Sequence, residues 1–367
     1  MNVLYVTTVP APYKVEMFEE LGKLCNLTVL FEKSSVSYRN EGWMVKKYNN
    51  FHAEFIKGLS FRDKMFSLGI IKHLKRNKYD LIIIGVYSTV SQMLAQEYMR
   101  KNKIPYVISS DGGIIKAENS FIKRIKKHFI SSAESWLSTG ELTNEYLVNY
   151  GAKRERIYVY PFTSILKKDV VEKVVSLEEK YKLRKKLNMA EDKIILSVGQ
   201  FIHRKGYDIL IKACKDLDKG IGVYIVGGTP TNEYIELKKE MNLTNVHFID
   251  FMKKDALGEY YKAADLFVLP TREDIWGLVI NEAVAYGLPV ISTDKCVAAV
   301  ELNRNKCIGE IIPSEDIVAL YDAIKKMFNN SDIDDICKNV METAKEYTIE
   351  NSAYVHYKIF EKIINNR

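Results

Sequence analysis

The stretch LFVLPTREDIWGLVINEAVAYGLPVIST, residues 266–293, indicates how the second half of the chain folds. An apolar run that ends at Pro270 is followed by an acidic turn, a short helical pattern and a second apolar run, which predicts strand, loop, helix and strand. A helix that begins near Gly277 carries Glu282 in its first turns and leaves Asp274 in the loop before it. The unpaired backbone N–H groups at such a helix start suit a phosphate group.

Length and charge limit what this stretch can belong to. The chain has 367 residues, more than a single hydrophobic core usually serves, so we expect two domains. Hydrophobic residues make up 47% of the sequence and charged residues 28%, a balance that excludes a disordered chain. The net charge of +7 favours anionic partners such as nucleotide phosphates or anionic lipid. The sequence contains no nucleic-acid-binding motif, so we expect no nucleic-acid partner.

Neither a zinc site nor a disulfide framework is expected. The five cysteines are an odd number, widely spread and without a CxxC pair, which fits free thiols in a reducing compartment. Asp216 and Asp218 form a DxD motif, but it precedes an apolar run instead of following one, so we interpret it as a solvated turn. The histidines lack ligand spacing, and we predict that no metal is required.

The start of the chain, MNVLYVTTVP, enters an apolar run without a basic segment or a small-residue cleavage site, and we expect no signal peptide. No apolar run approaches the roughly eighteen residues that span a bilayer. We therefore expect a cytoplasmic protein, with peripheral attachment to the inner face of the cell membrane left open.

Two series of apolar runs that alternate with helical patterns predict two α/β domains. The runs are continuous, as in parallel strands buried on both faces. They predict strands at residues 2–7, 27–31, 80–86, 106–109, 136–139 and 157–160, and then at 194–198, 223–226, 246–249, 266–269 and 290–292. The expected fold class is α/β, with two doubly wound Rossmann-like domains that face a cleft. The expected domains are residues 1–166 and 193–346, with a linker and connecting helix at 167–192 and a C-terminal helix at 347–367, whose return to the first domain is left open.

Three segments of the second half resemble the nucleotide-binding domain of a GT-B glycosyltransferase, in the large retaining family (family four) that builds bacterial polysaccharides. They are SVGQFIHRKGYDILIKA at 197–213, VHFIDFMKKDALGEYYKAADLFVLPTRED at 246–274 and WGLVINEAVAYGLPVIST at 276–293. The order and distances of the three segments make the resemblance specific. The first half matches mainly in pattern, including VPAPYK at 9–14 and YGAKRERIYVYPF at 150–162.

The resemblance implies a GT-B fold and a retaining transfer of sugar from a nucleotide diphosphate sugar, UDP-sugar favoured over GDP-sugar. The implied acceptor is a hydroxyl of a saccharide or lipid-linked molecule in cell-surface polysaccharide synthesis, and no cofactor is needed. Front-face attack, with the departing phosphate assisting deprotonation of the acceptor, is the mechanism of such a family. Two alternatives stay open: a sugar-nucleotide epimerase or hydrolase of the same fold, and a non-catalytic GT-B partner subunit.

The acidic residues of the opening stretch are the first site candidates. The resemblance implies that Glu282, the second acid of the family's E-x7-E signature, accepts hydrogen bonds from the ribose. The first acid stands at Asp274, one methylene shorter, with Glu273 beside it, and which of them reaches the donor sugar stays open. The alternative interpretation is that these acids only stabilise a helix start.

A basic turn supplies the candidates for the diphosphate. Arg204 and Lys205 follow an apolar run, and Gly206 lets the backbone turn into a helix, so two cations can point at phosphate. The family often has an arginine where Gln200 stands. The alternative is a solvated basic turn. The full set of donor-binding candidates is Gln200, Arg204, Lys205, Gly228, Trp276, Gly277, Leu278 and Glu282.

Asp111, in VISSDGGIIK, follows a strand of the first domain and is the third catalytic candidate beside Asp274 and Glu273. Its carboxylate could stabilise positive charge at the anomeric carbon or orient the acceptor hydroxyl; an Asp-Gly turn is the alternative. Residues on the acceptor side are expected to be Pro12, Tyr13 and Lys14.

A basic amphipathic segment, SFIKRIKKHFI at 120–130, predicts contact with an anionic membrane surface. Phe121, Ile122, Ile125 and Phe129 share one broad face, and the cations around it are Lys123, Arg124, Lys126 and Lys127. A second basic segment at 71–78 could assist. The alternative is a helix that packs on the sheet with a solvated basic edge.

Overall fold

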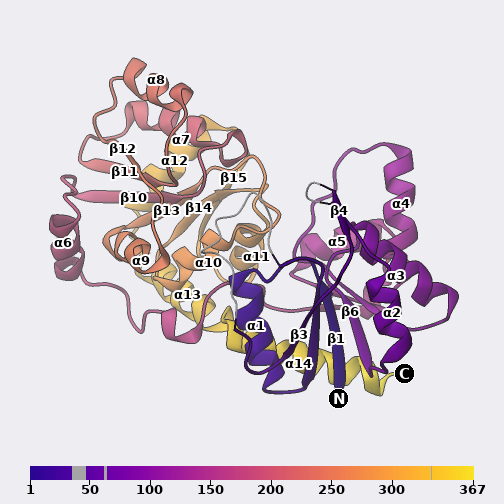
Figure 1. Cartoon of the computed structure of the whole chain (residues 1–367). Helices are drawn as coiled ribbons and strands as arrows, with labels where there is room; N and C mark the ends of the chain where they lie inside the picture. The colour runs from indigo at the N-terminus through magenta and orange to yellow at the C-terminus, as the bar shows by residue number, and fades with distance from the viewer. Residues whose placement is uncertain (35–46, 62–63, 332) are drawn as a thin grey trace. The chain divides into compact units, whose positions relative to one another are not determined.

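The computed structural model describes residues 1–34, 47–61, 64–331 and 333–367 (Figure 1). Contacts within the chain divide it into two compact units. The first unit contains Met1–Ser164 and Thr348–Arg367, and the second contains Ile165–Tyr347.

The first unit is built on a seven-stranded parallel sheet in the order β3-β2-β1-β6-β7-β8-β9. Its strands are β1 (Asn2–Thr7), β2 (Asn26–Phe31), β3 (His52–Phe55), β6 (Leu81–Ile84), β7 (Val107–Ser109), β8 (Ser135–Ser138) and β9 (Ile157–Val159). Its helices are α1 (Pro12–Gly22), α2 (Gly69–Arg76), α3 (Val90–Lys101), α4 (Ser120–Ile130), α5 (Glu141–Asn149) and α14 (Ile349–Asn365). A short antiparallel pair, β4 (Leu59–Phe61) and β5 (Lys64–Phe66), lies outside the main sheet.

The second unit has a six-stranded parallel sheet in the order β12-β11-β10-β13-β14-β15. Its strands are β10 (Lys193–Val198), β11 (Ile221–Val226), β12 (Val246–Ile249), β13 (Leu266–Leu269), β14 (Val290–Thr293) and β15 (Gly309–Ile312). Its helices are α6 (Leu177–Lys186), α7 (Tyr207–Ala213), α8 (Asn232–Glu240), α9 (Lys254–Ala263), α10 (Leu278–Ala285), α11 (Val297–Asn305), α12 (Ile317–Phe328) and α13 (Ile333–Glu346).

Both sheets reverse their strand order at the first strand of the unit. Strands added after β1 go first to one side, through β2 and β3, and then to the other, through β6. The second sheet does the same around β10, with β11 on one side and β13 on the other. This confirms the prediction of two doubly wound α/β units. In such sheets ligands bind outside the carboxyl ends of the strands at the reversal, which are β1 and β6 in one unit and β10 and β13 in the other.

The segment expected to be a linker with a connecting helix lies in the second unit, because α6 is tied to it by charge. The carboxylate of Asp265 forms two ion pairs with α6. Lys180 Nζ lies 2.9 Å from one of its oxygens, and a guanidinium nitrogen of Arg184 lies 2.6 Å from the other. Arg184 Nε also donates to the carbonyl of Ala263, at the end of α9. The opposite grouping holds at the other end of the chain, where α14 belongs to the first unit and packs against α1.

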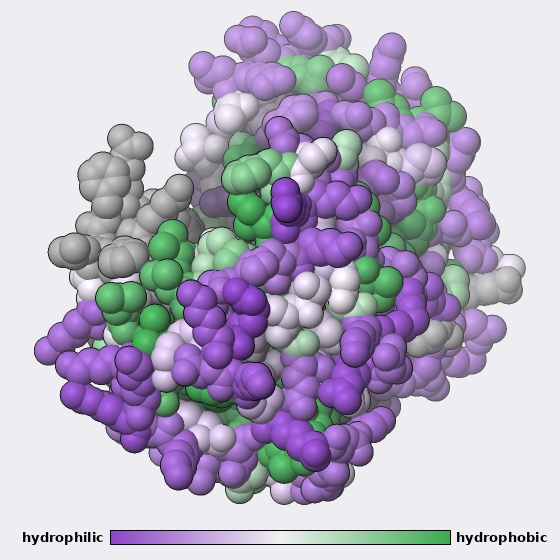
Figure 2. Space-filling model, turned by 90° about the vertical axis from the view of Figure 1, so that its right-hand side faces the viewer, coloured by the Kyte–Doolittle hydropathy of each residue, from purple (hydrophilic) through white to green (hydrophobic). Residues whose placement is uncertain are grey.

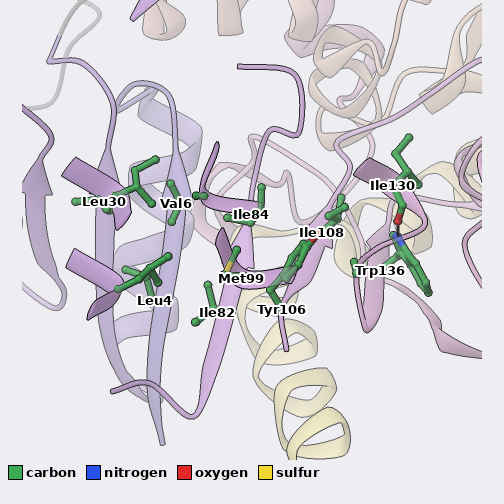
Figure 3. Packing of buried hydrophobic residues seen from close by; sticks show 14 of the residues in the cluster. Leu4, Val6, Leu30, Ile82, Ile84, Met99, Tyr106, Ile108, Ile130 and Trp136 are labelled. Carbon is green, nitrogen blue, oxygen red and sulfur yellow. Dashed lines mark hydrogen bonds between the residues drawn. The ribbon is translucent and has the colours of Figure 1, made fainter. Parts of the chain in front are cut away.

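The surface and the interior of the molecule differ sharply in hydropathy. Hydrophilic residues cover most of the face drawn in Figure 2, and hydrophobic residues appear there in small separate patches. In the first unit the buried side chains of β1, β6 and β7 meet those of α3 and of the loop before β8 (Figure 3). The indole N–H of Trp136 donates to the carbonyl of Ile130 at 2.8 Å, so the largest core side chain has its polar group satisfied. None of the helices in the described ranges combines the length and hydrophobicity needed to span a bilayer.

Candidate active site

The basic turn after β10 is held against the loop after β13. Gly206 has a φ of 71°, and a Cβ placed on it would lie 2.0 Å from the carbonyl oxygen of Pro270. Only glycine permits that approach. The carbonyl of Arg204 accepts hydrogen bonds from the Arg272 N–H and from the Thr271 hydroxyl, both at 2.8 Å. The HRKG and TRED segments, far apart in sequence, therefore form one surface at the carboxyl edge of the sheet.

Lys205 and Asp274, predicted to contact different parts of the donor, contact each other. Lys205 Nζ lies 2.6 Å from Asp274 Oδ2, and Arg204 Nη1 lies 3.3 Å from Oδ1 of the same carboxylate. The Lys205 side chain is 11% exposed and that of Arg204 is 43% exposed. Lys205 is thus not part of a solvated basic turn, and Arg204 is the more accessible of the two cations.

The backbone carbonyl of Glu273 also belongs to this cluster. It accepts from Arg204 Nη1 at 2.7 Å and from the Thr271 hydroxyl at 3.0 Å. The acidic side chain that joins the ion pair is that of Asp274. The position aligned with the family signature is therefore the one that faces the two cations.

Gly277 sets the start of α10. Its φ is 101°, and an added Cβ would lie 2.8 Å from the sulfur of Cys296. Trp276, just before it, is buried, and its indole N–H donates to Asn281 Oδ1 at 2.7 Å. Among the donor-binding candidates, Trp276 therefore supports the turn, while Leu278 begins the helix and is half-buried.

Glu282 lies in the second turn of α10, as the sequence indicated. Its Oε2 accepts a hydrogen bond from the hydroxyl of Tyr261 at 2.9 Å. Removal of the carboxyl group from water raises the pKa of Glu282, and the Tyr261 hydrogen bond and the charges of Lys254 and Lys205 offset that rise only in part. Tyr261 comes from α9 and stacks on Tyr286 with the rings nearly parallel. Sequence reasoning missed Tyr261, although it stands within the second family-like segment.

The ends of β11 and β12 leave an open surface beside this cluster. A Cβ on Gly227 would lie 1.7 Å from the carbonyl oxygen of Gly199, so the loops after β10 and β11 approach at van der Waals distance. Gly228 has a φ of 103° and only Phe251 near it, at 4.0 Å from an added Cβ. Phe251 is 72% exposed, and Gln200 is also exposed. Phe251, the second residue after β12, was not among the residues predicted for the site.

The first unit holds a second polar cluster, formed by Lys14 and Asp111. Lys14 Nζ lies 2.7 Å from Asp111 Oδ2, and the hydroxyl of Tyr160 donates to Oδ1 at 3.2 Å. Burial alone lowers the pKa of Lys14, but the Asp111 carboxylate together with the neighbouring Tyr13 and Tyr5 outweighs burial, and the pKa is raised. Pro12 occupies the first turn of α1, and the Tyr13 ring packs edge-on against Phe162. Asp111, predicted as a catalytic residue, is therefore a paired carboxylate.

The Lys14–Asp111 pair lines a small cavity that α14 helps to form. His356 of α14 borders it, and its Nδ1–H donates to the carbonyl of Ser352 at 2.8 Å. Burial lowers the pKa of His356 to about 4, so the imidazole is neutral. The sequence predicted the helix, and nothing in the spacing of its apolar residues indicated this buried histidine.

Two further sequence predictions concern the DxD motif and the need for a metal. Asp218 Oδ1 accepts from the Gly220 N–H at 2.8 Å, so the DxD motif serves a turn. Within the described ranges, no three His, Cys, Asp or Glu side chains are placed to hold a metal ion.

The basic helix α4 exposes its apolar residues instead of packing them on the sheet. Phe121 is 69% exposed and Ile122 is 48% exposed, while Ile130 is its buried residue. Lys126 does not point outward with the other cations: its Nζ lies 2.6 Å from Glu118 and over the ring of Tyr150. Of the four predicted cations, Lys126 is therefore paired with a carboxylate, and Lys123, Arg124 and Lys127 are exposed.

Comparisons with known proteins agree with this architecture. Residues 179–347 match the family model described as glycosyl transferases group 1. The O-antigen chain mannosyltransferase C of Escherichia coli is 23% identical over 270 residues, which cover 73% of this chain and 71% of that protein. Among solved structures, sucrose-phosphate synthase of Thermosynechococcus elongatus is similar over 100% of both chains, with a TM-score of 0.77 and 18% identity. The Anabaena protein HepE in complex with UDP has a TM-score of 0.75 and 15% identity, over 100% of this chain and 99% of that one.

Three observations agree on the GT-B fold and on a site in the second unit. They are the reversal of strand order in both sheets, the charged cluster at the carboxyl edge of β10 and β13, and the family match over the second unit. The chain has the GT-B fold, and residues 179–347 of its second unit match the family of glycosyl transferases group 1.

Proposed function

We propose that the chain transfers a sugar, with retention of anomeric configuration, from a UDP-sugar to a hydroxyl of a saccharide or lipid-linked acceptor in cell-surface polysaccharide synthesis. One observation carries the proposal: Glu282, Arg204 and Lys205 occur together at the carboxyl edge of the second sheet, beside the start of α10. The name of the Escherichia coli relative supports a polysaccharide product, and the UDP in the HepE complex supports uridine over guanosine.

Glu282 has the right chemistry for the ribose. A carboxylate removed from water gains most from new hydrogen-bond donors, and two ribose hydroxyls can supply them. The hydroxyl of Tyr261 already occupies one oxygen of the group, which fixes its orientation. The cost of holding this carboxylate away from water is then recovered when the donor binds.

Arg204 is the residue that we assign to the diphosphate, together with the backbone N–H groups at the start of α10. Its guanidinium is the accessible cation of the cluster, and its backbone is fixed by two hydrogen bonds to the neighbouring loop. The ion pair of Lys205 and Asp274 holds Arg204 in position, because Arg204 contacts the same carboxylate. The Asp274 carboxylate, facing both cations, is the acid that we assign to the donor sugar in preference to Glu273.

In the proposed step, the bond between the anomeric carbon and the diphosphate oxygen breaks as the acceptor oxygen bonds to the same face of that carbon. The acceptor's proton passes to the departing diphosphate, whose growing negative charge is stabilised by Arg204 and by the backbone N–H groups at the start of α10. Because these groups can stabilise such a leaving group, we propose a reaction without a metal or a cofactor. Asp111 is already paired with Lys14, and we assign it to orientation of the acceptor.

The first test is turnover of donor by the purified protein, with and without acceptor. We expect UDP-sugars to raise the melting temperature more than GDP-sugars, because a ligand that binds only the folded state stabilises it. We expect donor to be consumed at a high rate only when an acceptor saccharide is present. NMR of the product should show that the anomeric configuration is retained, and EDTA should leave the activity unchanged. Equal turnover without acceptor would favour a hydrolase or epimerase, and no turnover at all would favour a non-catalytic subunit.

We also propose that α4 places the first unit on an anionic membrane surface, at the inner face of the cell membrane. Phe121 and Ile122 of α4 are 69% and 48% exposed, and three cations around them form no ion pair with a described residue. Each such cation contributes about 1 kcal/mol near an anionic leaflet. Flotation with phosphatidylglycerol vesicles should be lost in Phe121→Ser/Ile122→Ser and in high salt. Leu177→Ser, which changes an even more exposed apolar residue of the second unit, should leave flotation unchanged. Flotation that is unchanged in the α4 variant would overturn this assignment.

A further inference from the structure

A groove of about 940 Å³ lies in the first unit, between the edge strand β3 and helix α2. Its volume is in the range of small-molecule sites. Its walls come from β3, from the loop that follows it and from the first two turns of α2. All of these residues belong to the first unit, and none is among the residues assigned above to the donor or the acceptor. Lys72 and Arg76 belong to the basic segment 71–78, which was expected to assist α4 at an anionic surface.

The groove carries an excess of positive charge. Lys57, Lys72 and Arg76 line it and are exposed, and none of the three forms an ion pair with a described residue. The one carboxylate of the lining, that of Glu54, is engaged with imidazoles: His73 Nδ1 lies 3.3 Å away and His52 Nε2 lies 3.2 Å away. Three cations thus face one occupied carboxylate. An anion entering the groove therefore meets three cations that form no ion pair with a described residue.

The same groove exposes a large apolar side chain, which a site for a simple anion does not need. Leu68 is 55% exposed just before α2. Leu30 and Ile56 form a buried apolar floor beside it, whereas the ring of Phe55 stacks on Phe31 at the other face of the sheet. An exposed leucine beside cations without ion pairs suits a ligand that is itself charged at one end and apolar at the other.

The types of cation in the groove indicate which anionic group the ligand carries. An arginine can bind two phosphate oxygens at once, and a lysine contributes a point charge that any phosphate accepts. Lys72 and Arg76 are one helical turn apart on α2, so both reach the same side of the groove. Two cations on one helix face and a third on the opposite wall match a compact group with several acceptor oxygens.

We propose that the β3–α2 groove binds the phosphate group of an amphiphile, a phosphate carried on a hydrocarbon chain, supplied by a lipid of the membrane. Helix α3 links this groove to α4, because Lys75 Nζ of α2 lies 5.6 Å from the Tyr98 ring centre and His128 of α4 pairs with Glu97. Helices α2, α3 and α4 therefore form one layer on the same side of the sheet (Figure 1). A lipid phosphate in the groove would hold the unit at the surface that α4 contacts, which is a function separate from sugar transfer.

Binding of soluble probes tests the site without a membrane, a donor or catalysis. In isothermal titration calorimetry of the full chain, octyl phosphate below its micelle concentration should bind at least tenfold more tightly than inorganic phosphate and than octanol. Lys72→Gln/Arg76→Gln should weaken octyl phosphate at least tenfold. Leu68→Ser should weaken octyl phosphate severalfold and leave inorganic phosphate unchanged. Lys153→Gln, an exposed lysine of the same unit outside the groove, should match the parent.

The source of the phosphate is tested with vesicles. Vesicles of phosphatidylcholine with one fifth phosphatidic acid should displace octyl phosphate from the parent chain, and pure phosphatidylcholine vesicles should not. The proposal is overturned if inorganic phosphate binds as tightly as octyl phosphate, if Lys72→Gln/Arg76→Gln keeps the parent affinity, or if phosphatidic acid vesicles leave octyl phosphate bound. Stabilisation of Lys72→Gln/Arg76→Gln by UDP-sugar, equal to that of the parent, shows that the variant is folded and keeps this result separate from the proposed transfer.

Discussion

Lys205 Nζ lies 2.6 Å from Asp274 Oδ2, so an acid and a cation that could have served different parts of the donor form one largely buried ion pair. Removal of one member leaves the other charged and without its partner. We expect Asp274→Asn to lower the free energy of unfolding by about 2–4 kcal/mol, because a charge left unpaired in a buried site is costly. Lys205→Met should cost a similar amount.

The double variant Lys205→Met/Asp274→Asn is the control for this pair. If the two side chains act on each other, its loss of unfolding free energy in urea should be smaller than the sum of the single losses by roughly 1–3 kcal/mol. Single losses that simply add would contradict a coupled pair.

We expect the carboxylate of Glu282 to lower the stability of the folded chain while it favours donor binding. Burial raises the pKa of its carboxyl group, so the folded chain binds this proton more tightly than the unfolded chain. Between the unfolded and the folded pKa, stability therefore falls as pH rises, and the ionised group is a net cost at pH 7. We expect Glu282→Gln to be more stable than the parent at pH 7 in urea unfolding, with the gain disappearing below the ordinary pKa of 4.5.

An exposed glutamate of the same unit provides the comparison. Glu236→Gln, on the outer face of α8, should leave the unfolding free energy within about 0.5 kcal/mol of the parent across this range. A Glu282→Gln variant that is less stable than the parent at pH 7 would show that the carboxylate is stabilised in the fold and is not held ready for a ligand.

His356 makes the first unit sensitive to acid. Its pKa falls from an ordinary 6.5 to about 4 because the imidazole is buried. A group whose folded pKa is depressed in this way is protonated more readily in the unfolded chain, so stability is lost as pH falls from 6.5 toward 4. The loss is on the order of 3 kcal/mol. His356→Phe keeps a ring against Tyr160 and should unfold with no such loss between pH 6.5 and 4. Parallel pH profiles of parent and variant would argue against a neutral buried histidine.

Gly206 should be the most demanding glycine of the donor cluster. Alanine there must adopt a positive φ and place its Cβ against the Pro270 carbonyl. We expect Gly206→Ala to cost roughly 1–3 kcal/mol in unfolding and to weaken UDP binding, because the basic turn must move away from the loop after β13. Gly220→Ala, where the only close atom is the end of the Asp218 side chain, should cost less than half as much.

The sequence predicted those features that depend on local pattern. Continuous apolar runs marked most strands of both sheets, and the acidic stretch with its glycine placed Glu282 on α10 and Asp274 before it. Strand β3 has no such run, since its residues are half-buried or exposed at the sheet edge, and α2 is a short basic segment. Strand β3 escaped prediction, and the segment of α2 was singled out only for its basic charge, because these sequences are typical of solvated surface.

Pairings between distant residues could not be predicted from pattern alone. Lys205 meets Asp274 because β10 and β13 are neighbours in the sheet, and Lys14 meets Asp111 because the carboxyl ends of β1 and β7 lie at the same edge. Strand order is decided by the packing of whole units. The exposure of the apolar side chains of α4 could not be predicted either. An amphipathic pattern does not say whether its apolar side packs on the protein or remains exposed.

The assignment of Glu282 to the donor ribose is the central claim, and calorimetry with UDP tests it most directly. We expect Glu282→Ala to weaken UDP at least tenfold, because a hydrogen bond to a charged group contributes about 1.5–3 kcal/mol, and to weaken it more than Asp274→Asn does. The parent should lose a similar factor when UDP is replaced by its 2′-deoxy or 3′-deoxy analogue, whereas Glu282→Ala should bind UDP and these analogues alike. Equal affinity of Glu282→Ala and the parent for UDP would contradict the account.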